Sequence, residues 1–178
     1  GRTITAADVQ ALRPDVVILA AGALPVIPPI PGADQPFVVT SDDVLSGQAQ
    51  VGQNVVIVGG GSCGAETADF LTQRGKKVTI IEMLDGLCPD MLPDAKHFLL
   101  ERLDRQQVAW MVSTKVESIG NHRVVVSRRE PGMDLQWTAA LEGVDTVVLA
   151  VGARPNQALA AELGRLGIAV QAVGDCVQ

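Results

Sequence analysis

The residues that most clearly carry chemistry are three glycines, Gly59, Gly61 and Gly64, which fit the spacing G-x-G-x-x-G. In this spacing the first glycine makes a tight turn, the second lets the backbone approach a pyrophosphate, and the third lets a helix pack closely on a strand. A helix beginning near Ser62 would direct its free amides and positive dipole end at the phosphates. The predicted cofactor-binding residues of this loop are Gly59, Gly60, Gly61, Ser62, Cys63 and Gly64.

Glu82 is the second predicted binding residue, because it follows the apolar stretch Val78–Ile81 about 20 residues after the glycines. A carboxylate at this place accepts hydrogen bonds from both ribose hydroxyls of adenosine and repels a 2′-phosphate. The sequence therefore favours NAD(H) over NADP(H). The alternative interpretation is a solvated charge at the end of a strand.

The elements that would position these residues form a βαβ unit. Val55–Val58 predicts a buried strand, the helical spacing continues to Arg74, and Val78–Ile81 predicts a second strand. A second helix and a third parallel strand follow, and then the turn signals of an antiparallel meander. These later elements are predicted at Asp94–Gln106 and Val108–Val112, and at Val116–Ile119, Arg123–Ser127 and Leu135–Ala140, with turns at Gly120-Asn121 and Pro131-Gly132. The predicted fold class is α/β, a Rossmann-like parallel sheet with helices on one side and a small antiparallel β-meander on the other, in three layers.

Two similar apolar stretches, Asp15–Gly22 and Asp145–Gly152, flank this block and predict buried strands. Between them, Pro25–Pro36 contains five prolines and predicts an extended crossover, because proline removes backbone donors. Short helices are predicted at Ser41–Leu45, with Ser41 as the capping residue, and at Ala158–Leu166. In the longer predicted helix Asp94–Gln106, the apolar positions are Phe98, Leu99 and Leu103. We expect three segments: residues 1–45 as a partial FAD-domain segment and crossover, 46–146 as an NAD(H)-binding domain, and 147–178 as a return segment to the FAD domain.

The composition argues against several classes of partner. The net charge is −6 and the five aromatic residues are scattered, so a nucleic-acid surface is not expected. No apolar stretch approaches the roughly 18 residues of a membrane helix, and no signal peptide is visible, which favours a cytoplasmic protein. The three cysteines lack metal-ligand spacing. Asp85, Asp90 and Asp94 favour a solvated loop over a metal site, so no metal is predicted.

With the glycine loop framed by Ile18–Pro25 and Val148–Asn156, the chain resembles the FAD/NAD(P)-binding module of the pyridine nucleotide-disulfide oxidoreductase superfamily. Within that superfamily, Lys77–Asp85 and Phe98–Leu103 look most like the C-terminal region of old-yellow-enzyme-related NADH:flavin oxidoreductases. These include 2-enoate reductase, dienoyl-CoA reductase and trimethylamine dehydrogenase. The resemblance covers nearly the whole chain.

The resemblance implies that the NAD-binding domain is inserted into an FAD-binding domain. Gly22 and Gly152 would lie on the two connections, and Gly174-Asp175 resembles a flavin-binding Gly-Asp. Glu66 matches a glutamate near the contact between nicotinamide and flavin, and it is the one predicted catalytic residue; its other interpretation is an acid that stabilises the first turn of the helix. Hydride would pass from NADH to FAD, and electrons onward to an iron–sulfur cluster and FMN.

The chain also departs from that family. The first FAD glycine loop, the barrel and the cluster cysteines are not found in these 178 residues, and there is no redox cysteine pair. We therefore expect the NADH-binding part of a larger flavoprotein, incomplete for turnover, with a nicotinamide dinucleotide and the rest of the parent protein as partners. Two alternatives stay open: a non-catalytic nucleotide-sensing or assembly module, and an electron-transfer subunit acting on ferredoxin-like partners.

Overall fold

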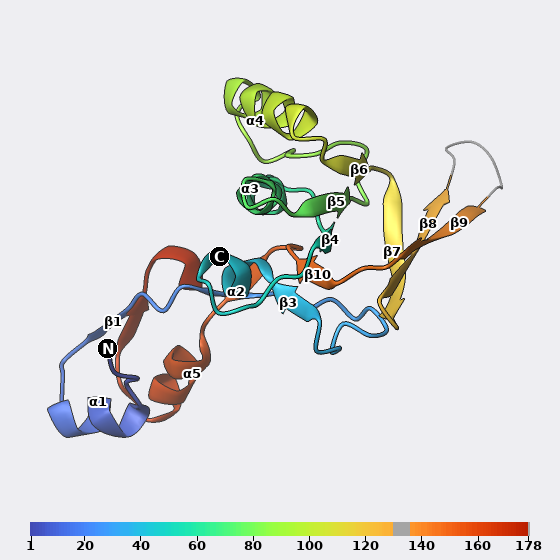
Figure 1. The fold of residues 1–178 in the computed structure, drawn as a ribbon. Helices are drawn as coiled ribbons and strands as arrows, with labels where there is room; N and C mark the ends of the chain where they lie inside the picture. Colours follow the sequence, from blue (N-terminus) through green and yellow to red (C-terminus); the bar gives the residue numbers. More distant parts are fainter. Residues whose placement is uncertain (130–135, 178) are drawn as a thin grey trace. The chain divides into compact units, whose positions relative to one another are not determined.

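The computed structural model describes residues 1–129 and 136–177, which divide into two compact units (Figure 1). Unit 1 combines residues 1–25 with 153–178, and unit 2 comprises Val26–Gly152. The predicted segment 46–146 lies inside unit 2. This unit also includes residues 26–45 and 147–152, because each of these stretches supplies a strand to its sheet. The predicted turn Pro131-Gly132 lies outside the described residues.

A five-stranded parallel sheet forms the centre of unit 2. Its order is β3-β10-β4-β5-β6, and every pair of neighbours is parallel. The strands are β3 (Val38–Thr40), β4 (Asn54–Val58), β5 (Lys77–Ile81), β6 (Ala109–Met111) and β10 (Thr146–Leu149), and the helices are α2 (Ser41–Leu45), α3 (Ser62–Thr72) and α4 (Pro93–Arg105). The βαβ unit, the second helix and the third parallel strand are thus confirmed. The strand β3, in contrast, was not predicted, because three residues after a proline-rich segment give no periodic signal.

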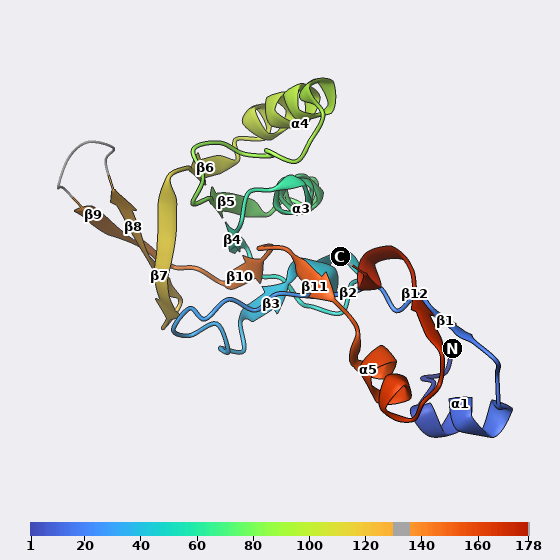
Figure 2. The same cartoon turned by 180° about the vertical axis from the view of Figure 1, so that it is seen from behind.

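The side chains of β4 alternate between the two faces of the sheet. Val55 and Ile57 pack into a core that includes Ala68 and Leu71 of α3. Val56 and Val58 face a second core, which is built from the antiparallel strands. Burial of each of these side chains contributes about 1.5–3 kcal/mol, so both faces of the strand stabilise unit 2. The predicted three-layer fold, with helices on one side and the meander on the other, is confirmed (Figures 1 and 2).

The meander consists of β7 (Thr114–Gly120), β8 (Arg123–Arg129) and β9 (Gln136–Glu142), paired antiparallel in that order. Gly120 pairs with Arg123, so the turn between β7 and β8 contains Asn121 and His122, one residue later than predicted. Both have positive φ angles, 51° and 56°, as a type I′ hairpin requires. The His122 ring stacks on the Phe37 ring, with 5.0 Å between the ring centroids. This stack connects the turn to the crossover that precedes β3.

Two local predictions about the helices are wrong. The N-cap of α2 is Thr40, not Ser41, because Thr40 and Asp43 form a reciprocal capping box. In α4 the predicted apolar position Phe98 is 64% exposed, whereas Leu99 and Leu103 are buried. A helix buries only one stripe, and that stripe runs through Leu99 and Leu103.

Unit 1 is built from short elements: α1 (Ala6–Leu12), β1 (Val17–Leu19), β2 (Ala23–Pro25), β11 (Ala153–Pro155), α5 (Ala158–Arg165), β12 (Val170–Ala172) and the 3-10 turn Gly174–Cys176. Strand β1 pairs in parallel with β12. The prediction of a strand within Asp15–Gly22 is confirmed for three residues, but the prediction that this strand is buried is wrong, since only Leu19 is buried and Ile18 is 71% exposed. Nothing among the described residues packs over this side chain closely enough to bury it. No helix in the described ranges is long and apolar enough to cross a membrane.

Candidate nucleotide-binding site

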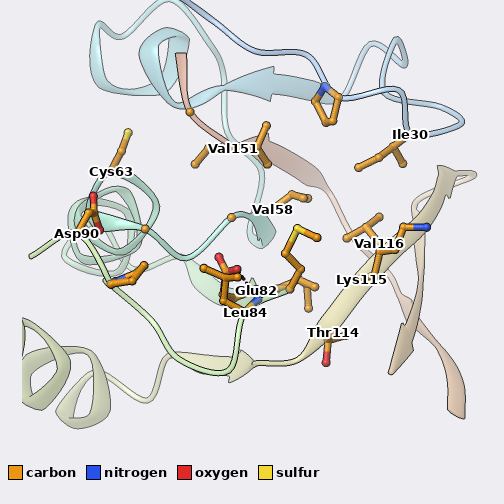
Figure 3. A pocket seen from close by; sticks show the side chains of 18 of the residues that line it. Ile30, Val58, Cys63, Glu82, Leu84, Asp90, Thr114, Lys115, Val116 and Val151 are labelled. Atoms are coloured by element: carbon orange, nitrogen blue, oxygen red, sulfur yellow. Dashed lines mark hydrogen bonds between the residues drawn. The ribbon is translucent and has the colours of Figure 1, made fainter. Parts of the chain in front are cut away.

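A cavity of about 670 Å³ lies in unit 2, where the chain leaves the carboxyl ends of β4, β5 and β10 (Figure 3). In parallel α/β sheets, ligands bind at this edge. Six of the predicted binding residues line it: Gly59, Gly61, Ser62, Cys63, Glu82 and Gly152. Most of the remaining wall comes from apolar side chains of residues 28–30, 83–84 and 116, and Thr114 and Lys115 add polar groups beside them. The structure therefore brings the glycine loop and the acid together around one space.

The three glycines of the motif meet different constraints. Gly59 has φ +103°, and a Cβ there would lie 2.3 Å from the carbonyl oxygen of Ala150. A Cβ on Gly64 would lie 2.0 Å from the carbonyl oxygen of Gly59, so this glycine lets α3 approach the strand. At Gly61 the nearest atoms are the Asp90 carboxylate oxygens, at 3.7 and 3.8 Å. The position that should face a pyrophosphate is thus free of backbone and apolar neighbours.

Glu82 is held at the end of β5 by two backbone amides. The nitrogen of Gly60 donates to Oε2 at 2.6 Å, and the nitrogen of Leu84 donates to Oε1 at 2.7 Å. The residue is only 7% exposed, so the alternative of a solvated strand-end charge is wrong. A carboxylate has about four lone-pair sites, and these two bonds leave one on each oxygen. Glu82 can therefore still accept two hydroxyl groups.

The amino end of α3 is also engaged. The Ser62 nitrogen donates to Asp90 Oδ1 at 3.0 Å, and the Ser62 hydroxyl donates to Oδ2. The hydroxyl bond, and then the amide bond, lower the pKa of Asp90. Asp90 is exposed, as expected for a solvated loop with Asp85 and Asp94, but its contact with the helix was not predicted. In the parts of the chain that the structure describes, no group of three or more His, Cys, Asp or Glu residues could hold a metal ion.

The remaining predicted residues lie elsewhere. Gly60 packs behind the loop, where a Cβ would meet Leu87. Glu66 is the fifth residue of α3, so the prediction that it falls on the first turn is wrong. Its side chain is exposed, and it is not among the described residues that line the cavity. Gly22, Gly174 and Asp175 belong to unit 1.

The part of the cavity wall that β7 contributes was not predicted from the sequence. Lys115 and Val116 line it from β7, just before a register shift between Val116 and Ser118. Lys115 pairs with Glu117 at 3.1 Å, and Ser127 donates to the same carboxylate at 2.6 Å. These hydrogen bonds, the Ser127 bond first, lower the pKa of Glu117. A bulge is a common way to redirect a side chain beside a site, but the sequence carries no signal for its position.

These features define the class of α/β dinucleotide-binding domains: a parallel sheet, a glycine loop at its carboxyl edge and an acid at the end of the next strand. A family model described as pyridine nucleotide-disulphide oxidoreductase matches residues 2–177. The chain belongs to this family.

The known proteins it matches are oxidoreductases of greater length. The chain is 38% identical to bilirubin reductase of Mediterraneibacter gnavus over 176 residues, which is 99% of this chain and 26% of that protein. It is 35% identical to an NADH oxidase of Thermoanaerobacter brockii over 180 residues, 98% of this chain and 27% of that one. Among solved structures, a 2-naphthoyl-CoA reductase complex matches with a TM-score of 0.89 and 28% identity, covering 98% of this chain and 26% of the other. The chain thus spans about a quarter of the length of these proteins.

Proposed function

We propose that this chain is the NADH-binding portion of a flavin-dependent oxidoreductase that passes hydride from NADH to FAD. The observation that carries the proposal is the position of Glu82, a nearly buried carboxylate with free acceptor sites that lines the same cavity as Gly61 and Ser62. Ribose recognition needs such an acceptor, and diphosphate binding uses the amino end of a helix. Both groups are present around one space.

Each part of the ADP half of NADH has a suitable partner. Glu82 would accept the two adenosine ribose hydroxyls, and its charge would repel the 2′-phosphate of NADPH. The backbone of Gly61 and the amino end of α3 would hold the diphosphate. The apolar wall, which includes Leu84 and Val116, suits the adenine ring. These residues bind and orient; the nicotinamide of NADH supplies the hydride.

The flavin contacts are proposed from the family resemblance. Gly174 and Asp175 would contact FAD, Gly22 and Gly152 would lie on the two connections between the domains, and Glu66 would lie beside the nicotinamide. The sequence contains one loop of the G-x-G-x-x-G type, so the flavin's own phosphate loop would belong to a larger parent protein. FMN and an iron–sulfur cluster, as in old-yellow-enzyme-related reductases, would also belong to that parent. The similarity to an NADH oxidase supports electron transfer from NADH, and the similarity to a bilirubin reductase supports a reductase as the parent protein.

Calorimetric titration with NADH, NADPH and FAD tests this proposal. The wild-type chain should bind NADH more tightly than NADPH, and FAD weakly. Glu82→Gln should weaken NADH binding about tenfold, which is about 1.4 kcal/mol, and should reduce the preference over NADPH. The matched control is Glu101→Gln, which removes the same charge from the exposed face of α4. Equal or tighter NADPH binding by the wild type, or strong FAD binding without NADH binding, would overturn the assignment.

A further inference from the structure

The loop that follows β5 folds back onto the glycine loop. The Cys88 nitrogen donates to the carbonyl oxygen of Gly60 at 2.8 Å, and both Leu87 and Cys88 are buried. These contacts fix the loop at its middle. Two residues later, the exposed Asp90 reaches the amino end of α3 and lines the cavity with Ser62. Figure 3 shows this side chain beside the helix.

The Asp90 carboxylate stands where the diphosphate should bind. Ser62 is the first residue of α3, and its N–H group has no partner within the helix. Asp90 takes that N–H, with its two oxygens at 3.0 and 3.3 Å, and the same oxygens lie 3.7 and 3.8 Å from where a Cβ of Gly61 would be. A phosphate oxygen cannot accept this N–H in the same way while Asp90 does. A phosphate group bound at the Ser62 N–H would also lie beside the Asp90 carboxylate, and the two negative charges would repel each other.

We propose that Asp90 competes with the ligand for the amino end of α3: its carboxylate occupies the diphosphate position and must move away before a dinucleotide binds. This inference rests on the proposed NADH-binding function. The side chain can turn aside by rotation about its own bonds while Cys88 keeps the loop backbone attached to Gly60. The displacement lowers the affinity for every ligand that carries a diphosphate. It leaves binding of an uncharged nucleoside unchanged.

Titration of the whole chain and of an Asp90→Asn variant with three probes tests the inference: NADH, inorganic pyrophosphate and adenosine. Asp90→Asn should bind NADH and pyrophosphate at least about fivefold more tightly than the wild type, because one unit of negative charge has been removed. Adenosine binding should stay within about twofold. Asp90→Ala, which also removes the acceptor, should show the same pattern.

Asp85→Asn is the matched control, since Asp85 is an exposed acid in the same loop and is not among the residues that line the cavity. It should leave the affinities for all three probes within about twofold of the wild type. If NADH binds the wild type and Asp90→Asn equally, the role of Asp90 is wrong and the NADH assignment stands. If pyrophosphate binding tightens while NADH binds neither protein, the NADH assignment is wrong and the anion role of Asp90 stands.

Discussion

The Oε2 atom of Glu82 lies 2.6 Å from the backbone nitrogen of Gly60, so the acid after β5 fixes the loop after β4. The two residues are 22 positions apart in the sequence and form one physical unit. Ligand recognition and loop geometry therefore depend on the same carboxylate. A substitution of Glu82 should change both, and the two effects can be measured separately.

Glu82→Ala should lower the free energy of unfolding by about 2–4 kcal/mol, because the buried amide of Gly60 and the partly buried amide of Leu84 lose their acceptor. Urea denaturation measures this loss. Glu101→Ala, which breaks an exposed pair with Arg105 on α4, should cost no more than about 0.5 kcal/mol. Equal losses in the two variants would show that the Glu82 contacts do not stabilise the loop.

Gly61→Ala and Gly64→Ala should separate binding from folding. A Cβ on Gly61 would lie 3.7 Å from its nearest neighbour, an Asp90 oxygen, so this variant should fold with nearly unchanged stability and bind NADH more weakly, since the methyl group stands in the diphosphate position. A Cβ on Gly64 would lie 2.0 Å from a backbone oxygen, so this variant should lose stability by about 2 kcal/mol or more. Thermal unfolding and NADH titration of both variants make the comparison.

Gly164→Ala is the control for those two substitutions. Gly164 lies within α5, has no atom within 4 Å of a Cβ position and has an ordinary φ angle. Alanine is the better helix former, so this variant should gain up to about 1 kcal/mol. A destabilised Gly164→Ala, or a Gly64→Ala as stable as the wild type, would contradict the packing described for these glycines.

The sequence predicted the parts of this site that depend on periodicity and on fixed spacing. The apolar stretches around Val55 and Val78, and the glycine spacing between them, identify the βαβ unit because each follows from local geometry. The contact between Ser62 and Asp90 could not be predicted, since it joins two residues 28 positions apart through a loop without periodicity. The exposure of Ile18 was missed for a related reason. An apolar stretch shows that a strand is favoured but does not show what covers it.

The contact between α3 and α4 should make stability depend on acid pH. Burial alone would raise the pKa of Asp69, but the hydrogen bond from Arg102, with further bonds from Gln73 and Gln106, outweighs it and lowers the pKa. The folded-state pKa is then below the unfolded value of about 3.9, so this stabilisation is present above about pH 4 and is lost as the pH falls through the folded value. We expect Asp69→Asn to cost about 1 kcal/mol at pH 7, because Arg102 is half exposed, and less as the pH falls below 4.

Denaturation curves at several pH values measure that difference. The control is Asp104→Asn, which changes an exposed acid on α4 and should leave the pH dependence unaltered. A constant difference between Asp69→Asn and the wild type from pH 7 to pH 3 would contradict a lowered pKa of Asp69.

The isolated chain should bind NADH without oxidising it. Hydride transfer needs a bound flavin, and the sequence supplies only one dinucleotide loop. We therefore expect no NADH-dependent dye reduction by the chain above the rate of free FAD alone. Steady-state assays with and without added FAD measure this. Turnover that saturates with FAD at micromolar concentration would instead show that these 178 residues form a complete flavin site.

If the cavity in unit 2 holds the ADP half of NADH, an NMR titration that follows the backbone amides as NADH is added should detect it at the glycine loop. We expect the amides of Gly61, Ser62 and Leu84 to shift together and to saturate with one ligand per chain. The amides of Gly164 and Gly167, in unit 1, should stay in place. Shifts confined to unit 1, or no saturable shift at Gly61 and Ser62, would show that this cavity does not bind NADH.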